Sequence, residues 1–139
     1  MNTTLEETMG TMADFVTQNN IKIASEYADR NPHIPDWNDA NHYKCKLTMG
    51  RKQMTIYFSQ GYGVTHEPEA ADVLNCLADD SAGVSNARSF EEWAEEYGYD
   101  TDSRKAEKVY NVCVKQAARL LSFLGEDLYN ELLWETERL

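Results

Sequence analysis

Long apolar runs are missing from this sequence, and so is the beginning of a secretory signal. No stretch approaches the roughly 20 consecutive apolar residues that a membrane-spanning helix needs. Residues 1–7 contain neither a basic start nor an apolar segment. We therefore expect a soluble cytoplasmic protein with no membrane partner.

Cysteine is scarce and the sequence holds no metal-binding motif. The three cysteines, Cys45, Cys76 and Cys113, lie far apart, and none belongs to a C-x-x-C pair. An odd number of isolated cysteines does not support a disulfide framework or a zinc knuckle, so we expect buried free thiols. The three histidines lack the spacing of H-E-x-x-H and related motifs. The sequence therefore predicts no bound metal and no cofactor.

Local catalytic and phosphate-binding motifs are also missing. Residues 61–63, Gly-Tyr-Gly, lack the third glycine and the lysine of nucleotide-binding loops. Residues 100–103 begin like a calcium loop, but Arg104 and Lys105 follow where ligands and a glycine belong. We expect Asp102 or Ser103 to cap a helix there instead. The chain is thus predicted not to be an enzyme, although a site dispersed along the sequence stays an alternative.

Basic residues are few, and their distribution is uneven. The chain has 13 lysines and arginines against 24 acidic residues, for a net charge of −11. Residues 67–102 contain eleven acidic residues and only Arg88, whereas residues 103–125 contain five basic residues and only Glu107. Such a chain is repelled by nucleic acid and attracted by a basic protein surface.

The fold class follows from length and periodicity. A chain of 139 residues, 42% of them hydrophobic, fits one domain over residues 1–139, with residues 1–10 frayed. Alternating apolar residues predict a strand over 21–27 and a hairpin over 43–59 that turns near Gly50. The expected architecture is α+β: a small three-stranded antiparallel sheet covered by three to four helices.

Helical periodicity begins at Pro68. A first helix presents Ala70, Val73, Leu74 and Leu77 and is expected to break over residues 79–85. A second helix over 90–97 has the capping box Ser89–Glu92 and ends at Gly98. A third helix over 103–124 has the longest apolar stripe, and a fourth begins at Glu126. The stripe of the third helix consists of Ala106, Val109, Tyr110, Cys113, Ala117, Leu120, Leu121 and Leu124.

Carboxylates crowd onto one segment at a local cost in stability. In the helix over 90–97, glutamates one turn apart repel each other by a few tenths of a kcal/mol per pair. Two aspartates near the predicted end of the preceding helix meet an unfavourable helix dipole. The basic face of the next helix offsets this cost, or the segment is a functional acidic surface. The candidate partner-binding residues are Asp79, Asp80, Glu91, Glu92, Glu95, Glu96, Tyr99 and Asp100.

Three tracts resemble a set of small proteins encoded by bacteriophages. They are MTIYFSQG at 54–61, DVLNCL at 72–77 and FEEWAEEYGYDTDSRKAE at 90–107, and the likeness covers residues 40–125. The resemblance implies an accessory protein that a phage makes inside a bacterium. Proteins of that kind often block host defence systems such as CRISPR complexes and restriction enzymes, and some imitate DNA. The resemblance transfers no catalytic residues.

The leading hypothesis combines the acidic segment with this resemblance. It is a non-enzymatic, phage-encoded inhibitor whose acidic, DNA-mimicking surface binds a basic groove on a protein or ribonucleoprotein complex in the host cytoplasm. One alternative is a nucleic-acid-binding module that uses Lys44, Lys46, Tyr57 and the basic face of the helix over 103–124. Another is a structural homo-oligomer of the phage.

Overall fold

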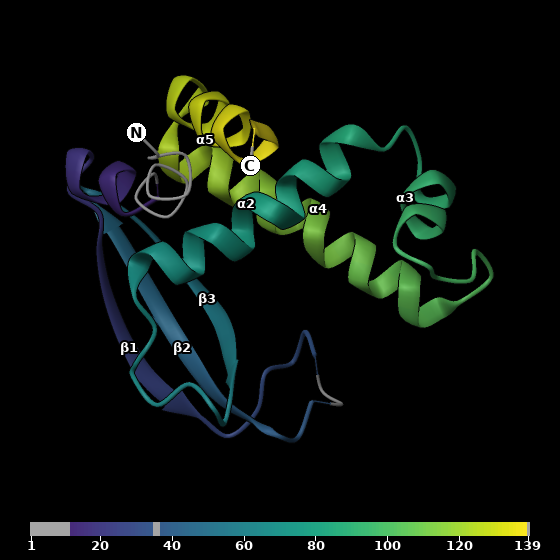
Figure 1. The fold of residues 1–139 in the computed structure, drawn as a ribbon, viewed down its shortest axis with the longest axis horizontal. Coiled ribbons are helices and arrows are strands. Elements are labelled where there is room, and N and C mark those ends of the chain that lie inside the picture. The colour runs from purple at the N-terminus through teal and green to yellow at the C-terminus, as the bar shows by residue number, and fades with distance from the viewer. Residues whose placement is uncertain (1–11, 35–36, 139) are drawn as a thin grey trace, which may run out of the picture. The chain divides into compact units, whose positions relative to one another are not determined.

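The structure, a computed structural model, describes residues 12–34 and 37–138. It contains a three-stranded antiparallel sheet together with helices (Figure 1), so the predicted α+β class is confirmed. The predicted fraying of residues 1–10 lies outside the described residues. Among the described helices, none combines the length and the apolar content needed to cross a membrane. The chain divides into two compact units, Met1–Asn75 and Cys76–Leu139, and a single domain stays a prediction.

The sheet belongs to the first unit. Residues 12–18 are helical and precede β1 (Lys22–Ala28), β2 (Ala40–Met49) and β3 (Lys52–Gly61). The strand order is β1-β2-β3, and both pairings are antiparallel. Met49 pairs with Lys52, which leaves a two-residue loop. Gly50 in this loop has a φ of +62°, as the first central position of a type II′ hairpin turn requires.

Alternation along β2 and β3 separates a buried face from a polar one, as predicted. Cys45 pairs with Ile56 and Leu47 with Met54, and all four side chains are buried. The lysines at residues 44 and 46 fall on the opposite face and are exposed. The period of two thus places the apolar set on one side of the sheet.

The predicted limits of the first long helix are wrong at both ends. α2 (Ala70–Asn86) begins two residues after Pro68, where the backbone N–H of Glu69 donates to the Asp72 carboxylate as in half of a capping box. The expected break over 79–85 does not occur. Small buried residues flank the polar pair at 79–80 and continue the buried side of α2: Ala78 before it, and Ser81 and Ala82 after it.

The boundaries predicted for the later helices agree with the structure to within one residue. These helices are α3 (Phe90–Glu96), α4 (Arg104–Leu124) and α5 (Glu126–Arg138). The Ser89 hydroxyl accepts the N–H of Glu92, and the Ser103 hydroxyl accepts the N–H of Ala106, both at 3.2 Å. Gly98 and Gly125 follow α3 and α4 with φ values of +76° and +86°. Polar caps and left-handed glycines therefore set these helix ends.

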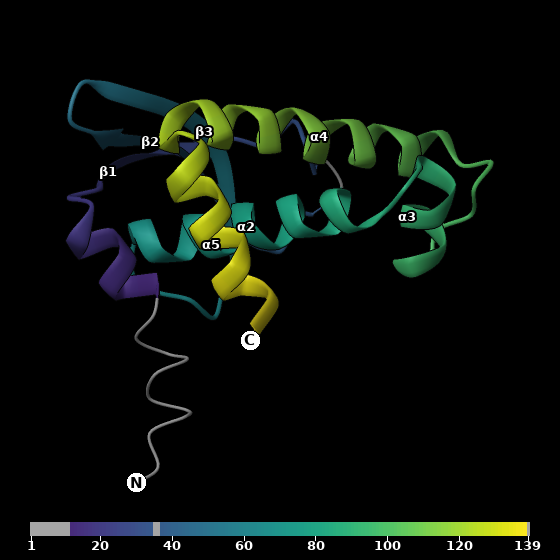
Figure 2. The same cartoon turned by 90° about the horizontal axis from the view of Figure 1, so that it is seen from above.

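A small core joins α3 to α4 in the second unit. Trp93 and Ala94 of α3 are buried with Cys113 of α4, and partly buried apolar residues surround them. Figure 2 shows α3 beside the first turns of α4, with α5 continuing from the far end of α4. These contacts fix the orientation of α3 relative to α4.

Two burial predictions need correction. Leu121 was assigned to the apolar stripe of α4, but its side chain is 39% exposed, and Phe123 is buried in its place. All three cysteines are free, as expected, yet only Cys45 and Cys113 are buried, while Cys76 is exposed.

Candidate functional site

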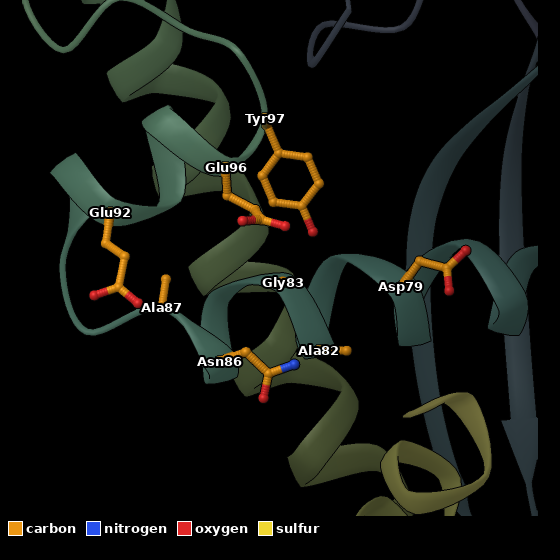
Figure 3. A pocket seen from close by; sticks show the side chains of 8 residues that line it. All are labelled: Asp79, Ala82, Gly83, Asn86, Ala87, Glu92, Glu96 and Tyr97. Carbon is orange, nitrogen blue, oxygen red and sulfur yellow. The ribbon is translucent and has the colours of Figure 1, made fainter. Parts of the chain in front are cut away.

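An open pocket of about 550 Å³ lies between α2 and α3 in the second unit (Figure 3). Eight residues line it, three of them carboxylates and none of them basic. They are Asp79, Ala82, Gly83, Asn86, Ala87, Glu92, Glu96 and Tyr97. The pocket lining therefore combines three carboxylates with three small residues, Ala82, Gly83 and Ala87.

Helical spacing explains why these residues meet. On α2, residues 79, 82, 83 and 86 follow the i, i+3, i+4, i+7 pattern of one helix face. On α3, Glu92 and Glu96 are one turn apart and share a face, and Tyr97 follows directly. Because α2 continues through Asn86, the aspartate at 79 lies within a helix, not at its end as predicted.

Tyr97 forms one wall of the pocket, and Gly83 makes room for it. A Cβ atom at residue 83 would lie 2.5 Å from the Tyr97 hydroxyl oxygen and 3.2 Å from the ring carbon that carries it. Glycine is therefore needed here for close approach and not for an unusual backbone angle. In Figure 3 the Tyr97 ring extends from the end of α3 toward α2.

An aromatic cluster holds this end of α3 in place. The centroid of the Trp93 ring lies 5.4 Å from that of Tyr97 and 5.3 Å from that of Tyr99. The Tyr99 ring is stacked on Trp93 at an interplanar angle of 8°. Trp93 also contacts Phe90 and Tyr110, with ring centroids at 6.3 and 5.2 Å. Such ring contacts add to the stability that burial alone provides. The pocket wall is thus attached to the core through Trp93.

Three titratable groups in or next to the pocket have raised pKa values. Burial raises the pKa of Asp79, and burial together with the neighbouring Asp79 raises the pKa of Asp80 to about 6. Burial, helped by the charges of Glu96 and Asp80, also raises the pKa of the Tyr97 hydroxyl. Negative charge is therefore costly along this side of α2, and a cation placed here would relieve that cost.

The structure brings together three of the eight candidate partner-binding residues: Asp79, Glu92 and Glu96 line the pocket. Asp80 is half-buried beside it, and Glu91 and Glu95 are exposed on α3 outside the lining.

Two further candidates have structural roles. The Tyr99 ring stacks on Trp93, as described above, and the Asp100 carboxylate accepts the N–H of Asp102 at 3.0 Å. Ser103, and not Asp102, caps α4.

Sequence reasoning missed Asn86, Gly83 and Tyr97 as pocket residues. Gly83 and Asn86 lie within or just beyond the stretch expected to break the helix, so the α2 face that they share with Asp79 was not predicted. Tyr97 belongs to the end of α3 and reaches the pocket only through the tertiary fold. The helical spacing of residues 79, 83 and 86 is the sequence signal that could have revealed the shared face of α2, and it gives no signal for Tyr97.

The polar face of the sheet carries the residues of the alternative hypothesis. Lys44 lies directly beside Tyr57 in the register, and Lys46 lies beside Thr55. Glu26 on β1 pairs with Lys44 from the other side, so the face is mixed in charge rather than uniformly basic. A shallow hollow of about 270 Å³ crosses the two lysines. This face is a weaker electrostatic site than the acidic pocket.

Among the residues that the structure describes, no three histidine, cysteine or carboxylate side chains are placed so that they could hold a metal ion, and the three carboxylates of the pocket are no exception. Comparison with known proteins finds no matching family model, no matching curated protein and no matching solved structure. Any function assigned to this protein therefore depends on the geometry of the pocket and on the sequence.

Proposed function

We propose that this protein is a non-enzymatic inhibitor, made by a phage, that binds a basic groove on a host nucleic-acid-handling defence complex such as a CRISPR-Cas assembly. The observation that carries this proposal is the pocket between α2 and α3, which has three carboxylates and no basic residue in its lining. The phage origin and the class of target come from the sequence resemblance and from the acidic segment over 67–102.

The chemistry of the pocket fits a cationic side chain of the partner. A guanidinium or ammonium group donates only hydrogen bonds, and the pocket offers the carboxylate oxygens of Asp79, Glu92 and Glu96 as acceptors. The Tyr97 ring, which is 52% exposed, provides an aromatic surface of the kind on which guanidinium groups stack. A basic groove that holds nucleic acid presents these same cations, so occupation by this protein would exclude the nucleic acid.

The target can be found and tested in two steps. Affinity capture from phage-infected bacteria identifies a bound complex, and a direct binding assay with the purified complex then measures affinity at low and high salt. We expect Glu92→Gln with Glu96→Gln to weaken binding about tenfold or more, and the wild-type affinity to fall with salt. Removal of charge leaves the size of the side chains unchanged.

A matched control lies on the same helix. Glu91→Gln with Glu95→Gln removes the same charge from α3 outside the pocket, and we expect a smaller loss of affinity. If the pocket variant binds the purified target as tightly as wild type, the acidic pocket is not the interface. A gel-shift assay at low salt addresses the alternative: retardation of DNA or RNA that depends on Lys44 and Lys46 would favour a nucleic-acid-binding module.

A further inference from the structure

β1 forms one edge of the sheet. In the part of the chain that the structure describes, its one strand partner is β2. Within the described residues, no backbone hydrogen bond from another segment reaches residues 22–28. An edge strand presents a row of N–H and C=O groups that another strand can pair with, unless the protein blocks it.

The charges along β1 are complementary to themselves. Lys22 and Glu26 are exposed, project from the same face and lie two residues on either side of Ala24. If two copies of β1 pair antiparallel about Ala24, Lys22 of each copy lies opposite Glu26 of the other. This register forms two pairs of opposite charge across the strands, an arrangement that stabilises a sheet. β3, at the other edge, contains no acidic residue and offers no such match.

The opposite face of β1 favours the same register. Tyr27 is 72% exposed, although its ring stacks on the buried Tyr43 at 5.0 Å. In the pairing about Ala24, Tyr27 lies opposite Ile21 and diagonal to the half-buried Ile23 of the second copy. Diagonal neighbours are within reach of an aromatic side chain. Dimerisation would therefore cover an exposed tyrosine ring on each copy.

We propose that two copies of this chain associate through antiparallel pairing of their β1 strands, forming a continuous six-stranded sheet with a two-fold axis at Ala24. The β1 edge lies in the first unit and contains no residue of the acidic pocket. The test of this dimer is therefore independent of the test of the proposed function. A single pair of seven-residue strands is small beside the roughly 1,200 Å² of a stable interface, so the dimer is expected to be weak and concentration-dependent.

The test is sedimentation velocity of the full chain from about 10 μM to about 1 mM, a range that covers dissociation constants of weak dimers. Wild type is expected to shift from monomer to dimer. Lys22→Glu places like charges opposite each other twice and should weaken the dimer about fivefold or more. The double variant Lys22→Glu with Glu26→Lys restores opposite charges and should restore the dimer.

A charge-matched control lies at the other edge of the sheet. Lys52→Glu in β3 changes the net charge as much as Lys22→Glu, and it should leave the dimer unchanged. Amide hydrogen exchange should slow in β1 as the concentration rises, and circular dichroism confirms that each variant is folded. A monomer at every concentration overturns the proposal, as does a dimer that Lys22→Glu does not weaken or that the double variant does not restore.

Discussion

The Tyr97 ring packs over Gly83 so closely that the first carbon of any side chain at residue 83 would meet the Tyr97 hydroxyl oxygen at 2.5 Å. A glycine inside a helix normally costs about 1 kcal/mol relative to alanine. The contact offers a physical reason for this cost in the last turn of α2, because it lets the end of α3 approach and close one side of the pocket.

The first prediction concerns this contact. We expect Gly83→Ala in the wild-type background to lower the free energy of unfolding or leave it unchanged, because the gain in helix propensity is offset by displacement of Tyr97. In a Tyr97→Ala background Gly83→Ala should raise the free energy of unfolding by about 0.5–1 kcal/mol. Urea unfolding of the four proteins gives the coupling energy. Equal effects of Gly83→Ala in the two backgrounds would show that the two residues are not coupled.

The second prediction concerns Trp93, which joins α3 to α4. The side chain is 4% exposed and contacts four other aromatic rings. We expect Trp93→Ala to lower the free energy of unfolding by about 3–5 kcal/mol, as large core truncations do. Val114→Ala on the exposed side of α4 is the control, and its effect should stay within about 0.5 kcal/mol. A loss near 0.5 kcal/mol for Trp93→Ala would contradict the central role of this ring.

Elements with strong local signals were predictable from the sequence. The hairpin combines alternation on both strands with a glycine in its loop, and α3 and α4 begin at serine caps. Each of these signals acts within a few residues of the structure it determines, so it can be recognised without knowledge of the tertiary fold.

The end of α2 was not predictable in the same way. The polar pair at 79–80 and Gly83 suggest a break when only neighbouring residues are considered. In the structure the helix continues because small residues around the polar pair are buried, and because Tyr97, fourteen residues later, occupies the space over Gly83. The same distant contact created the pocket, so only part of the candidate site could be foreseen.

The third prediction concerns the cap of α4. The Ser103 hydroxyl accepts the N–H of Ala106, which has no partner within the helix otherwise. We expect Ser103→Ala to lower the free energy of unfolding by about 1 kcal/mol, and Ser103→Asp to retain most of the stability. Thermal and urea unfolding measure both variants. If alanine and aspartate were equivalent at this position, the hydrogen bond of the cap would contribute nothing.

The fourth prediction concerns Asp80, whose pKa burial and Asp79 raise from 3.8 to about 6. A raised pKa means that the folded state holds this proton more tightly than the unfolded state does. Stability from this group is therefore complete below pH 3.8 and is lost as the pH rises through about 6. Asp80→Asn removes the buried charge, so we expect the variant to be more stable than wild type at neutral pH.

The expected gain is about 1 kcal/mol at neutral pH, less than the pKa difference alone implies, because the side chain keeps some contact with solvent. The gain should shrink as the pH falls through about 6 and vanish near 3.8. Urea unfolding of both proteins across this range provides the measurement. Asp79→Asn is the matched control: its side chain is more exposed, so its gain at neutral pH should be smaller. A stability difference between Asp80→Asn and wild type that does not change with pH would mean that Asp80 titrates in the folded protein as it does in the unfolded chain.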